Sequence, residues 1–83
     1  MLDRDGMISL ILIYANEIHI DSDGFVALTT NDELMNVVIK EVNEQVTWLS
    51  GRDSQVPLSC EDIAKIVSIL KQSLIQHGIV KQK

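Results

Sequence analysis

Two segments of this 83-residue chain, 18–42 and 46–74, follow the same plan. Each begins with a short apolar stretch, turns at a polar segment that contains glycine, continues with a second apolar stretch, and ends with a helix cap and an amphipathic run. The apolar stretches contain β-branched residues, which favour strands, and the glycines permit left-handed turn conformations. The repeat therefore predicts two copies of a strand–strand–helix unit.

The stretch before the first copy predicts one more strand. Residues 8–14 (Ile-Ser-Leu-Ile-Leu-Ile-Tyr) show almost no polar alternation, as is typical of a strand that is covered on both faces. We expect the other strands at 17–21, 25–28, 46–49 and 56–58. The predicted fold is therefore α+β, in the order βββαββα, with two helices packed on a mostly antiparallel sheet.

The segment 44–49 is ambiguous between a strand and a helix. Val46 and Leu49 keep the spacing of the preceding helix, which would extend it. Val46, Thr47 and Trp48 favour a strand, and a Ser-Gly turn follows them. The internal repeat leads us to prefer the strand.

Two polar caps predict where the helices begin. Thr30 and Glu33 have the spacing of a capping box, and Ser59 and Asp62 have the same spacing. The first helix is expected over 30–43. The second is expected from Cys60 to about His77, with the apolar stripe Ile63, Ile66, Val67, Leu70 and Leu74.

The end of the second helix also has a recognisable pattern. Gly78 suits a left-handed helix end, and Ile79 is placed to complete a Schellman motif. We expect residues 1–6 and 80–83 to be frayed. The remainder forms one small α+β domain, because 83 residues lie near the lower limit for a core that is stable on its own.

Composition indicates a soluble, cytoplasmic protein. Apolar residues make up 46% of the chain, which is too many for a disordered segment. No apolar run approaches the roughly 18 residues that a membrane span needs, and Asp3 and Asp5 are unlike the basic front of a secretory signal. A single cysteine, Cys60, fits a reducing compartment.

No motif in the chain predicts a metal or cofactor site. Residues 21–24 (Asp-Ser-Asp-Gly) are similar to part of a calcium loop. If Gly24 is the invariant glycine of that loop, the twelfth position is Thr30, so the closing bidentate glutamate is missing. The segment is better interpreted as a hairpin turn. His19 and His77 have no metal-ligand spacing with Cys60.

The chain also lacks a recognisable catalytic motif. There is no G-x-S-x-G elbow and no glycine-rich phosphate loop. Cys60 lies at a helix start, but Glu61 and Asp62 oppose a lowered thiol pKa there. Trp48 and Arg52 are residue types that are common at binding hot spots, although a single Trp in a small domain is more often part of the core. We therefore expect no enzyme and no cofactor.

Charge is distributed unevenly along the chain. Residues 1–44 contain nine acidic residues and only two basic ones, Arg4 and Lys40, so this part carries a net charge of -7. The whole chain carries -5, because the remainder is net positive. An acidic domain repels phosphate backbones and attracts basic protein surfaces. We therefore expect a protein partner with a basic surface, no membrane partner, and contacts at Asp21, Asp23, Asp32 and Glu33.

Excess apolar surface predicts self-association. The strand 8–14 is apolar on both faces, and Ile69 widens the apolar arc of the second helix beyond what one sheet face needs. We therefore expect a homodimer, formed through Ile8, Leu10, Leu12 and Ile69.

These features together predict a small non-catalytic interaction or regulatory domain: an adaptor, an inhibitor or a subunit that acts as a homodimer with an acidic face. One alternative is a nucleic-acid-associated regulator that uses the second helix and the basic tail, with Lys65, Lys71, Lys81 and Lys83. Another is a ligand-binding domain or enzyme whose site is built across the dimer interface.

Overall fold

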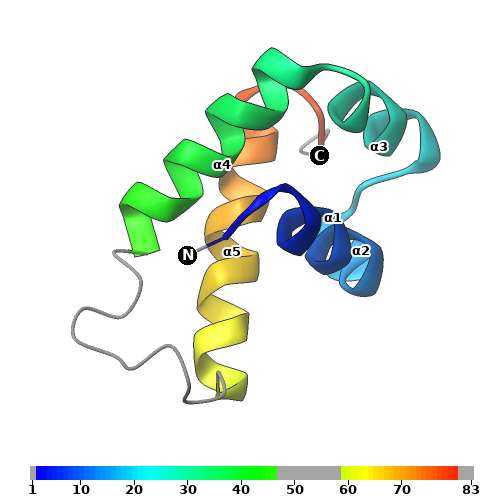
Figure 1. Ribbon diagram of the computed structural model, residues 1–83. Helices are drawn as coiled ribbons and strands as arrows, with labels where there is room; N and C mark the ends of the chain where they lie inside the picture. Colours follow the sequence, from blue (N-terminus) through cyan, green and yellow to red (C-terminus); the bar gives the residue numbers. More distant parts are fainter. Residues whose placement is uncertain (1, 47–58, 81–83) are drawn as a thin grey trace.

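The protein is helical throughout the part of the chain that the structure describes. The structure is a computed structural model, and it describes residues 2–46 and 59–80. Those residues form helices and no strand (Figure 1): α1 (Arg4–Ile13), α2 (Ala15–Ile18), α3 (Ser22–Thr29), α4 (Asp32–Val46) and α5 (Cys60–Gln76). The predicted α+β fold with the order βββαββα is therefore wrong.

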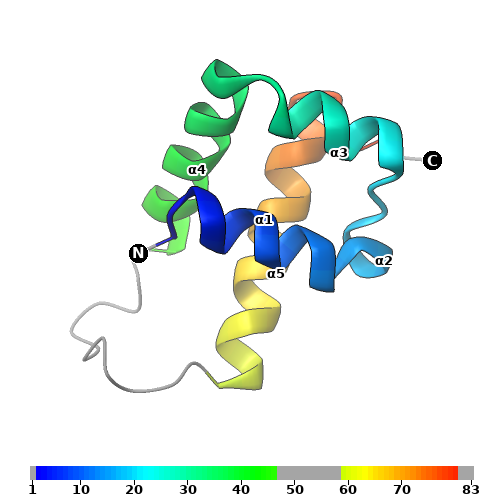
Figure 2. The same ribbon diagram turned by 45° about the vertical axis from the view of Figure 1, so that its right-hand side comes forward.

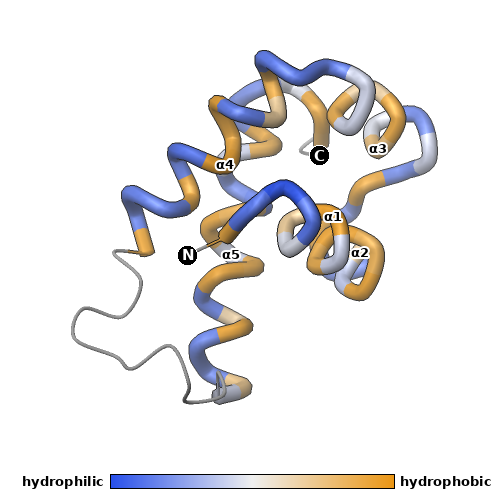
Figure 3. The backbone as a smooth tube through the Cα atoms, in the orientation of Figure 1, coloured by the Kyte–Doolittle hydropathy of each residue, from blue (hydrophilic) through white to orange (hydrophobic). Residues whose placement is uncertain are grey.

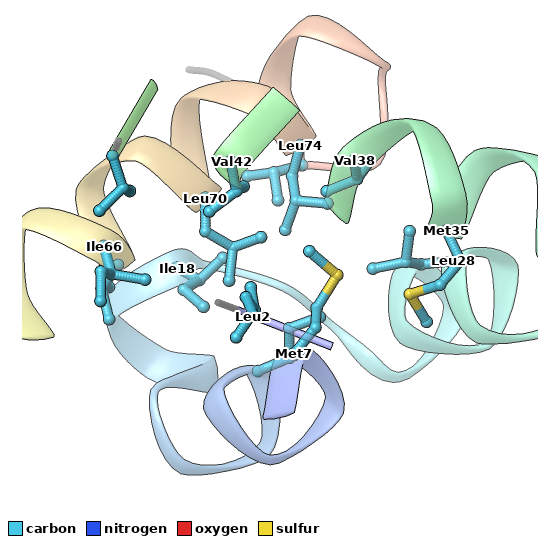
Figure 4. Packing of buried hydrophobic residues seen from close by; sticks show 14 residues of the cluster. Leu2, Met7, Ile18, Leu28, Met35, Val38, Val42, Ile66, Leu70 and Leu74 are labelled. Atoms are coloured by element: carbon cyan, nitrogen blue, oxygen red, sulfur yellow. The ribbon is translucent and has the colours of Figure 1, made fainter. Parts of the chain in front are cut away.

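The longest helix, α5, lies at the centre of the arrangement. α4 packs along it, α2 also contacts it, and α3 contacts α4 (Figures 1 and 2). The core lies between the α4–α5 pair and the N-terminal helices. There Leu70 and Val42 face Ile18 and Met7 (Figure 4). Leu2 and Val80, near the two ends of the chain, are also buried in this cluster.

The segment 8–14, expected as a strand, belongs mainly to α1. Asp3 caps this helix, because its Oδ1 accepts a hydrogen bond of 2.7 Å from the backbone N–H of Gly6. Met7 and Ile11, one helical turn apart, are completely buried. A short apolar run has no periodicity that separates a strand from a buried helix. Burial of these two side chains outweighs the small cost of β-branched residues in a helix, which is below about 0.7 kcal/mol each.

The strands expected at 17–21 and 25–28 are also helical in large part. α2 ends at His19, whose φ of 63° is left-handed, and Ile20 follows in the connection to α3. Asp21 then caps α3, because its Oδ1 accepts a 2.7 Å hydrogen bond from the Gly24 N–H. The segment that we interpreted as a hairpin turn is thus a helix start.

The helix expected over 30–43 is present as α4, but with different ends. Asn31 caps it through a 3.1 Å hydrogen bond from the Leu34 N–H to Oδ1. Thr30 instead ends α3 and donates its hydroxyl to the Val26 carbonyl at 2.6 Å. α4 continues through Val46, so the preference for a strand at 46–49 is wrong at its first residue. The rest of that strand, the strand at 56–58, Trp48 and Arg52 lie outside the described residues.

The prediction for α5 is confirmed. Ser59 and Asp62 form a reciprocal capping box. At the other end Gly78 has a left-handed φ of 76°, and the N–H groups of Gly78 and Ile79 donate to the carbonyls of Ile75 and Leu74, which is a Schellman motif. The expected stripe faces the core, with Ile63 only partly buried. Hydrophobic residues dominate the end of α1, whereas polar and apolar residues alternate along α4 (Figure 3).

Candidate functional site

An apolar cavity of about 240 Å³ opens between α1, α2 and the start of α3. Ile11, Leu12 and Ala15 line it from the first two helices, and Ile20, Phe25 and Val26 line it from the α2–α3 connection and α3. Two of these side chains are unusually accessible for large apolar residues: Leu12 is 62% exposed and Val26 is 54% exposed. The surface around the cavity is therefore a patch of apolar side chains in contact with solvent.

A second cavity, of about 330 Å³, also has Asp21 in its wall. Its walls come from His19, Asp23 and Gly24 around the start of α3, and from Gly78 and Ile79 at the end of α5. Asp21 lines both cavities. One carboxylate therefore lies at the boundary between an apolar cavity and a polar, acidic one.

Gly24 is what allows α3 to start so close to the end of α5. A Cβ atom at this position would lie 3.0 Å from the carbonyl oxygen of Ile79 and 3.2 Å from Oδ1 of Asp21. The first contact is with backbone, which has little room to move away. The small residue thus brings Asp21 and the Schellman turn of α5 together as two walls of the polar cavity.

The surface over α1–α3 is strongly acidic. Residues 5–31 contain Asp5, Glu17, Asp21 and Asp23, and no Lys or Arg. The nearest cation before them, Arg4, forms a 2.7 Å ion pair with Asp32 and donates to the Thr29 carbonyl at 3.1 Å. The acidic groups around the two cavities therefore have no lysine or arginine partner in their own segment.

The four acidic residues expected to bind a partner are not gathered in one place. Asp21 and Asp23 lie at the start of α3, beside the cavities. Asp32 and Glu33 lie in the first turn of α4, which follows the other end of α3, and Asp32 is paired with Arg4. Asp21 and Asp23 thus remain as the acidic pair that adjoins a cavity.

The residues expected to mediate self-association are also in different environments. Ile8, Leu10 and Ile69 are partly buried and pack against the core. Leu12 is the member of the group that remains mostly exposed, and it lies at the apolar cavity. Its neighbour Ile13 is 71% exposed.

A polar cluster joins α4 to α5. The hydroxyl of Ser73, which is buried, donates a 2.6 Å hydrogen bond to Oε2 of Glu41. Nε2 of His77 lies 3.1 Å from Oε1 and 3.0 Å from Oε2 of the same carboxylate. The hydrogen bond from Ser73 is the main cause that lowers the pKa of Glu41. Burial raises that pKa but is outweighed, because the hydrogen bond and charge of His77 also lower it.

This cluster has the residue types of a hydrolytic triad but a different connectivity. In a triad the base bonds the nucleophile and the acid orients the base. Here the carboxylate of Glu41 lies between the two, and the Ser73 hydroxyl donates to Glu41 instead of to His77. Ser73 is also 1% exposed, which keeps a substrate away from it. The arrangement fastens two helices together.

The sequence alone predicts neither the apolar cavity nor the cluster of Glu41, Ser73 and His77. The apolar cavity was hidden because its walls were assigned to a sheet, although the Asp21–Gly24 spacing fits a helix cap equally well. Nothing in the pattern of the helix over 30–43 singles out Glu41. A signal for the cluster was present in Ser73, which lies three residues after Leu70 and seven after Ile66 and is therefore a polar residue within the apolar stripe.

Across residues 2–46 and 59–80, no group of three or more His, Cys, Asp or Glu side chains has the geometry to hold a metal ion. Cys60 is exposed and is not in a disulfide. Within the same ranges, no helix has both the length and the apolar character that crossing a membrane requires. Comparison with protein families, with curated proteins and with solved structures found no match to this chain.

Proposed function

We propose that this protein is a non-catalytic interaction domain whose α1–α3 surface binds a partner protein through a basic segment. The observation that carries the proposal is the apolar cavity beside Leu12 and Val26, placed in a stretch of chain without lysine or arginine. Exposed apolar side chains that surround a concave surface are typical of protein-binding sites.

The size of the cavity favours a side chain over a metabolite. Pockets for small molecules and cofactors usually measure about 300–1,000 Å³ and present several convergent polar groups. This cavity measures about 240 Å³, and Asp21 and Ser22 are its only polar wall residues among those described. An apolar side chain from another protein matches both properties.

Charge supports a basic partner. Asp5, Glu17, Asp21 and Asp23 attract cationic segments, and the same field repels nucleic acids and anionic metabolites. Acidic groups at the edge of an interface mainly raise the association rate and set the choice of partner. The protein would then act as an adaptor, an inhibitor or a regulatory subunit.

Self-association is the second candidate, favoured by the exposure of Leu12 and Ile13. A homodimer formed through this surface would bury the same apolar side chains. It would also bring two acidic surfaces together, which like-charge repulsion disfavours. Sedimentation at micromolar concentration distinguishes the two, because a homodimer has twice the 9.3 kDa chain mass.

The proposed function is tested by selecting random peptides of about 16 residues, displayed on phage, against the folded protein. We expect selected peptides to be rich in Lys and Arg and to bind the double variant Asp21→Asn/Asp23→Asn more weakly. Asn keeps the helix cap while removing charge. The matched control is Glu44→Gln/Glu61→Gln, which removes two exposed carboxylates from α4 and α5. Failure to select any peptide, or selection of acidic ones, would contradict the proposal.

A further inference from the structure

We infer that the partner segment carries a large apolar side chain next to a Lys or Arg, with the apolar side chain in the cavity beside Leu12 and the cation in the cavity beside Asp21 and Asp23. This inference rests on the proposed function and specifies what the α1–α3 surface recognises. It predicts a two-part motif, because the two cavities differ in chemistry and share one wall.

The apolar cavity provides the first contact. Ile11, Phe25 and Val26 form apolar walls around a volume of about 240 Å³. A Leu, Ile, Met or Phe side chain of the partner would fill this volume and remove both the cavity walls and its own apolar surface from water. Apolar side chains anchored in pockets in this way contribute most of the binding energy of protein interfaces. A glutamate placed there would lose its hydration, gain no partner from the apolar walls and be repelled by Asp21.

The shared wall provides the second contact. Oδ1 of Asp21 accepts the Gly24 N–H, and a carboxylate has further acceptor positions for a cation. Asp23, in the first turn of α3, lines the same polar cavity. The two carboxylates carry a formal charge of about -2, which outweighs the roughly +0.5 of the helix N-terminus. The polar cavity is therefore the favourable place for an ammonium or guanidinium group.

Charge complementarity favours a basic–apolar segment of a different protein over a second copy of this chain. The segment 5–31 has no lysine or arginine to place beside Asp21 and Asp23, and Arg4 at the start of α1 is already paired with Asp32. A copy docked through the same surface would therefore have to break that ion pair to supply a cation. A basic–apolar segment of a different protein meets both requirements.

The closing experiment uses the tightest-binding peptide from the phage selection and the full-length protein. Each apolar residue of the peptide is replaced by Ala, and each Lys or Arg by Gln. Affinities are measured by titration, and the binding site is mapped by amide chemical shifts of the ¹⁵N-labelled protein. We expect one apolar residue and one neighbouring cation each to account for about a tenfold loss of affinity.

Variants of the protein separate anchoring from simple charge attraction. Leu12→Asp and Val26→Asp place a negative charge at the apolar cavity, so they would strengthen an association driven only by charge. We expect them to weaken peptide binding about tenfold, because they make the cavity polar. The matched control is Val37→Asp on α4, since Val37 is 43% exposed and lines neither cavity. The fold of every variant is verified by its amide spectrum.

The outcomes separate this inference from the proposed function. The inference is supported if the peptide changes the amide chemical shifts of Leu12, Phe25 and Val26. Leu12→Asp and Val26→Asp must also lower the affinity for the peptide, whereas the control Val37→Asp must not. If a basic peptide shifts amides of α1–α3 but not those of Leu12, Phe25 and Val26, or if Leu12→Asp binds it more tightly, the inference is wrong and the proposed function remains. If the shifts map outside α1–α3, both are wrong. If no peptide is selected, both are wrong.

Discussion

At the residue scale, Glu41 is the most informative side chain of the helix pair α4–α5. It holds Ser73 at 2.6 Å and His77 at 3.0 Å, and both belong to α5. These contacts stabilise the charged form of the carboxyl, so its pKa is lower in the folded protein than in the unfolded chain. Because the folded pKa is lowered, this contribution to stability is present above the ordinary glutamate pKa and is lost as pH falls through the folded value.

We therefore predict that Glu41→Gln reduces the acid sensitivity of the fold. The free energy of unfolding of the wild type should fall more steeply than that of the variant as pH drops below the ordinary pKa of glutamate. Chemical denaturation at a series of pH values measures both slopes. Glu44→Gln, on the same helix and exposed, is the control and should keep the wild-type slope. Parallel curves for the wild type and Glu41→Gln would contradict the prediction.

Asn43 makes a second long-range connection at this scale. Its side-chain Oδ1 accepts from the Leu2 N–H at 3.0 Å, and its Nδ2 donates to the Leu2 carbonyl at 3.0 Å. The amide side chain thus pairs with backbone of the segment before α1 as a neighbouring strand would. It fastens that segment to α4 and helps to keep Leu2 in the core.

At the scale of elements, a side-chain cap marks the start of α1, α3, α4 and α5. Asp3 and Asp21 occupy the first position of two similar segments, Asp-Arg-Asp-Gly and Asp-Ser-Asp-Gly, and each accepts from the glycine N–H three residues later. This true repeat relates α1 to α3. It differs from the strand–strand–helix repeat that we inferred from the positions of apolar stretches and glycines.

The cap of α4 is tested by comparing neighbouring residues. We predict that Asn31→Ala lowers the free energy of unfolding by about 1 kcal/mol, because the Leu34 N–H loses its acceptor. Ser59→Ala should cost a similar amount at α5. Thr30→Ala is the control and should change stability by less than about 0.5 kcal/mol, since the exposed Thr30 hydroxyl caps neither helix start. Denaturant midpoints measure all three, and an equal loss for Thr30 and Asn31 would argue against the assignment.

The extent to which the sequence predicted these elements depended on how specific each signal was. The prediction of α5 is confirmed from its cap at Ser59 to the Schellman motif at Ile79, because the capping box, the regular apolar stripe and the glycine at the helix end all indicate the same helix. The sequence wrongly predicts a strand at 8–14, because an apolar run of seven residues has no period that separates a strand from a helix. The cavity beside Leu12 could not be predicted, since it depends on how α1, α2 and α3 are arranged in space.

At the scale of the whole molecule, one core holds all five described helices together. Leu70 on α5 is completely buried, and α5 contacts both α4 and α2 (Figures 1 and 4). The N-terminal helices are short, and isolated helices of this length are marginal in water. Their structure therefore depends on packing against α4 and α5.

We predict that Leu70→Ala destabilises the whole domain by about 2–5 kcal/mol, through lost apolar burial and a residual cavity. Native-state hydrogen exchange should show faster global opening for amides of α1 and α3 as well as α5, because they share one core. Ile13→Ala, at a residue that is 71% exposed, is the control and should change stability by less than about 0.5 kcal/mol. Unchanged exchange in α1–α3 would show that these helices fold independently of α5.

The absence of lysine and arginine from residues 5–31 has a consequence for covalent chemistry on this surface. Trypsin has no cleavage site within that segment whether it is folded or open. Reagents that acylate amines also have no lysine to modify there. Carboxyl activation is different, because activated Asp21 or Asp23 would form an amide directly with a lysine of a bound protein. A zero-length carbodiimide crosslink would therefore record which lysine of the partner lies beside α3.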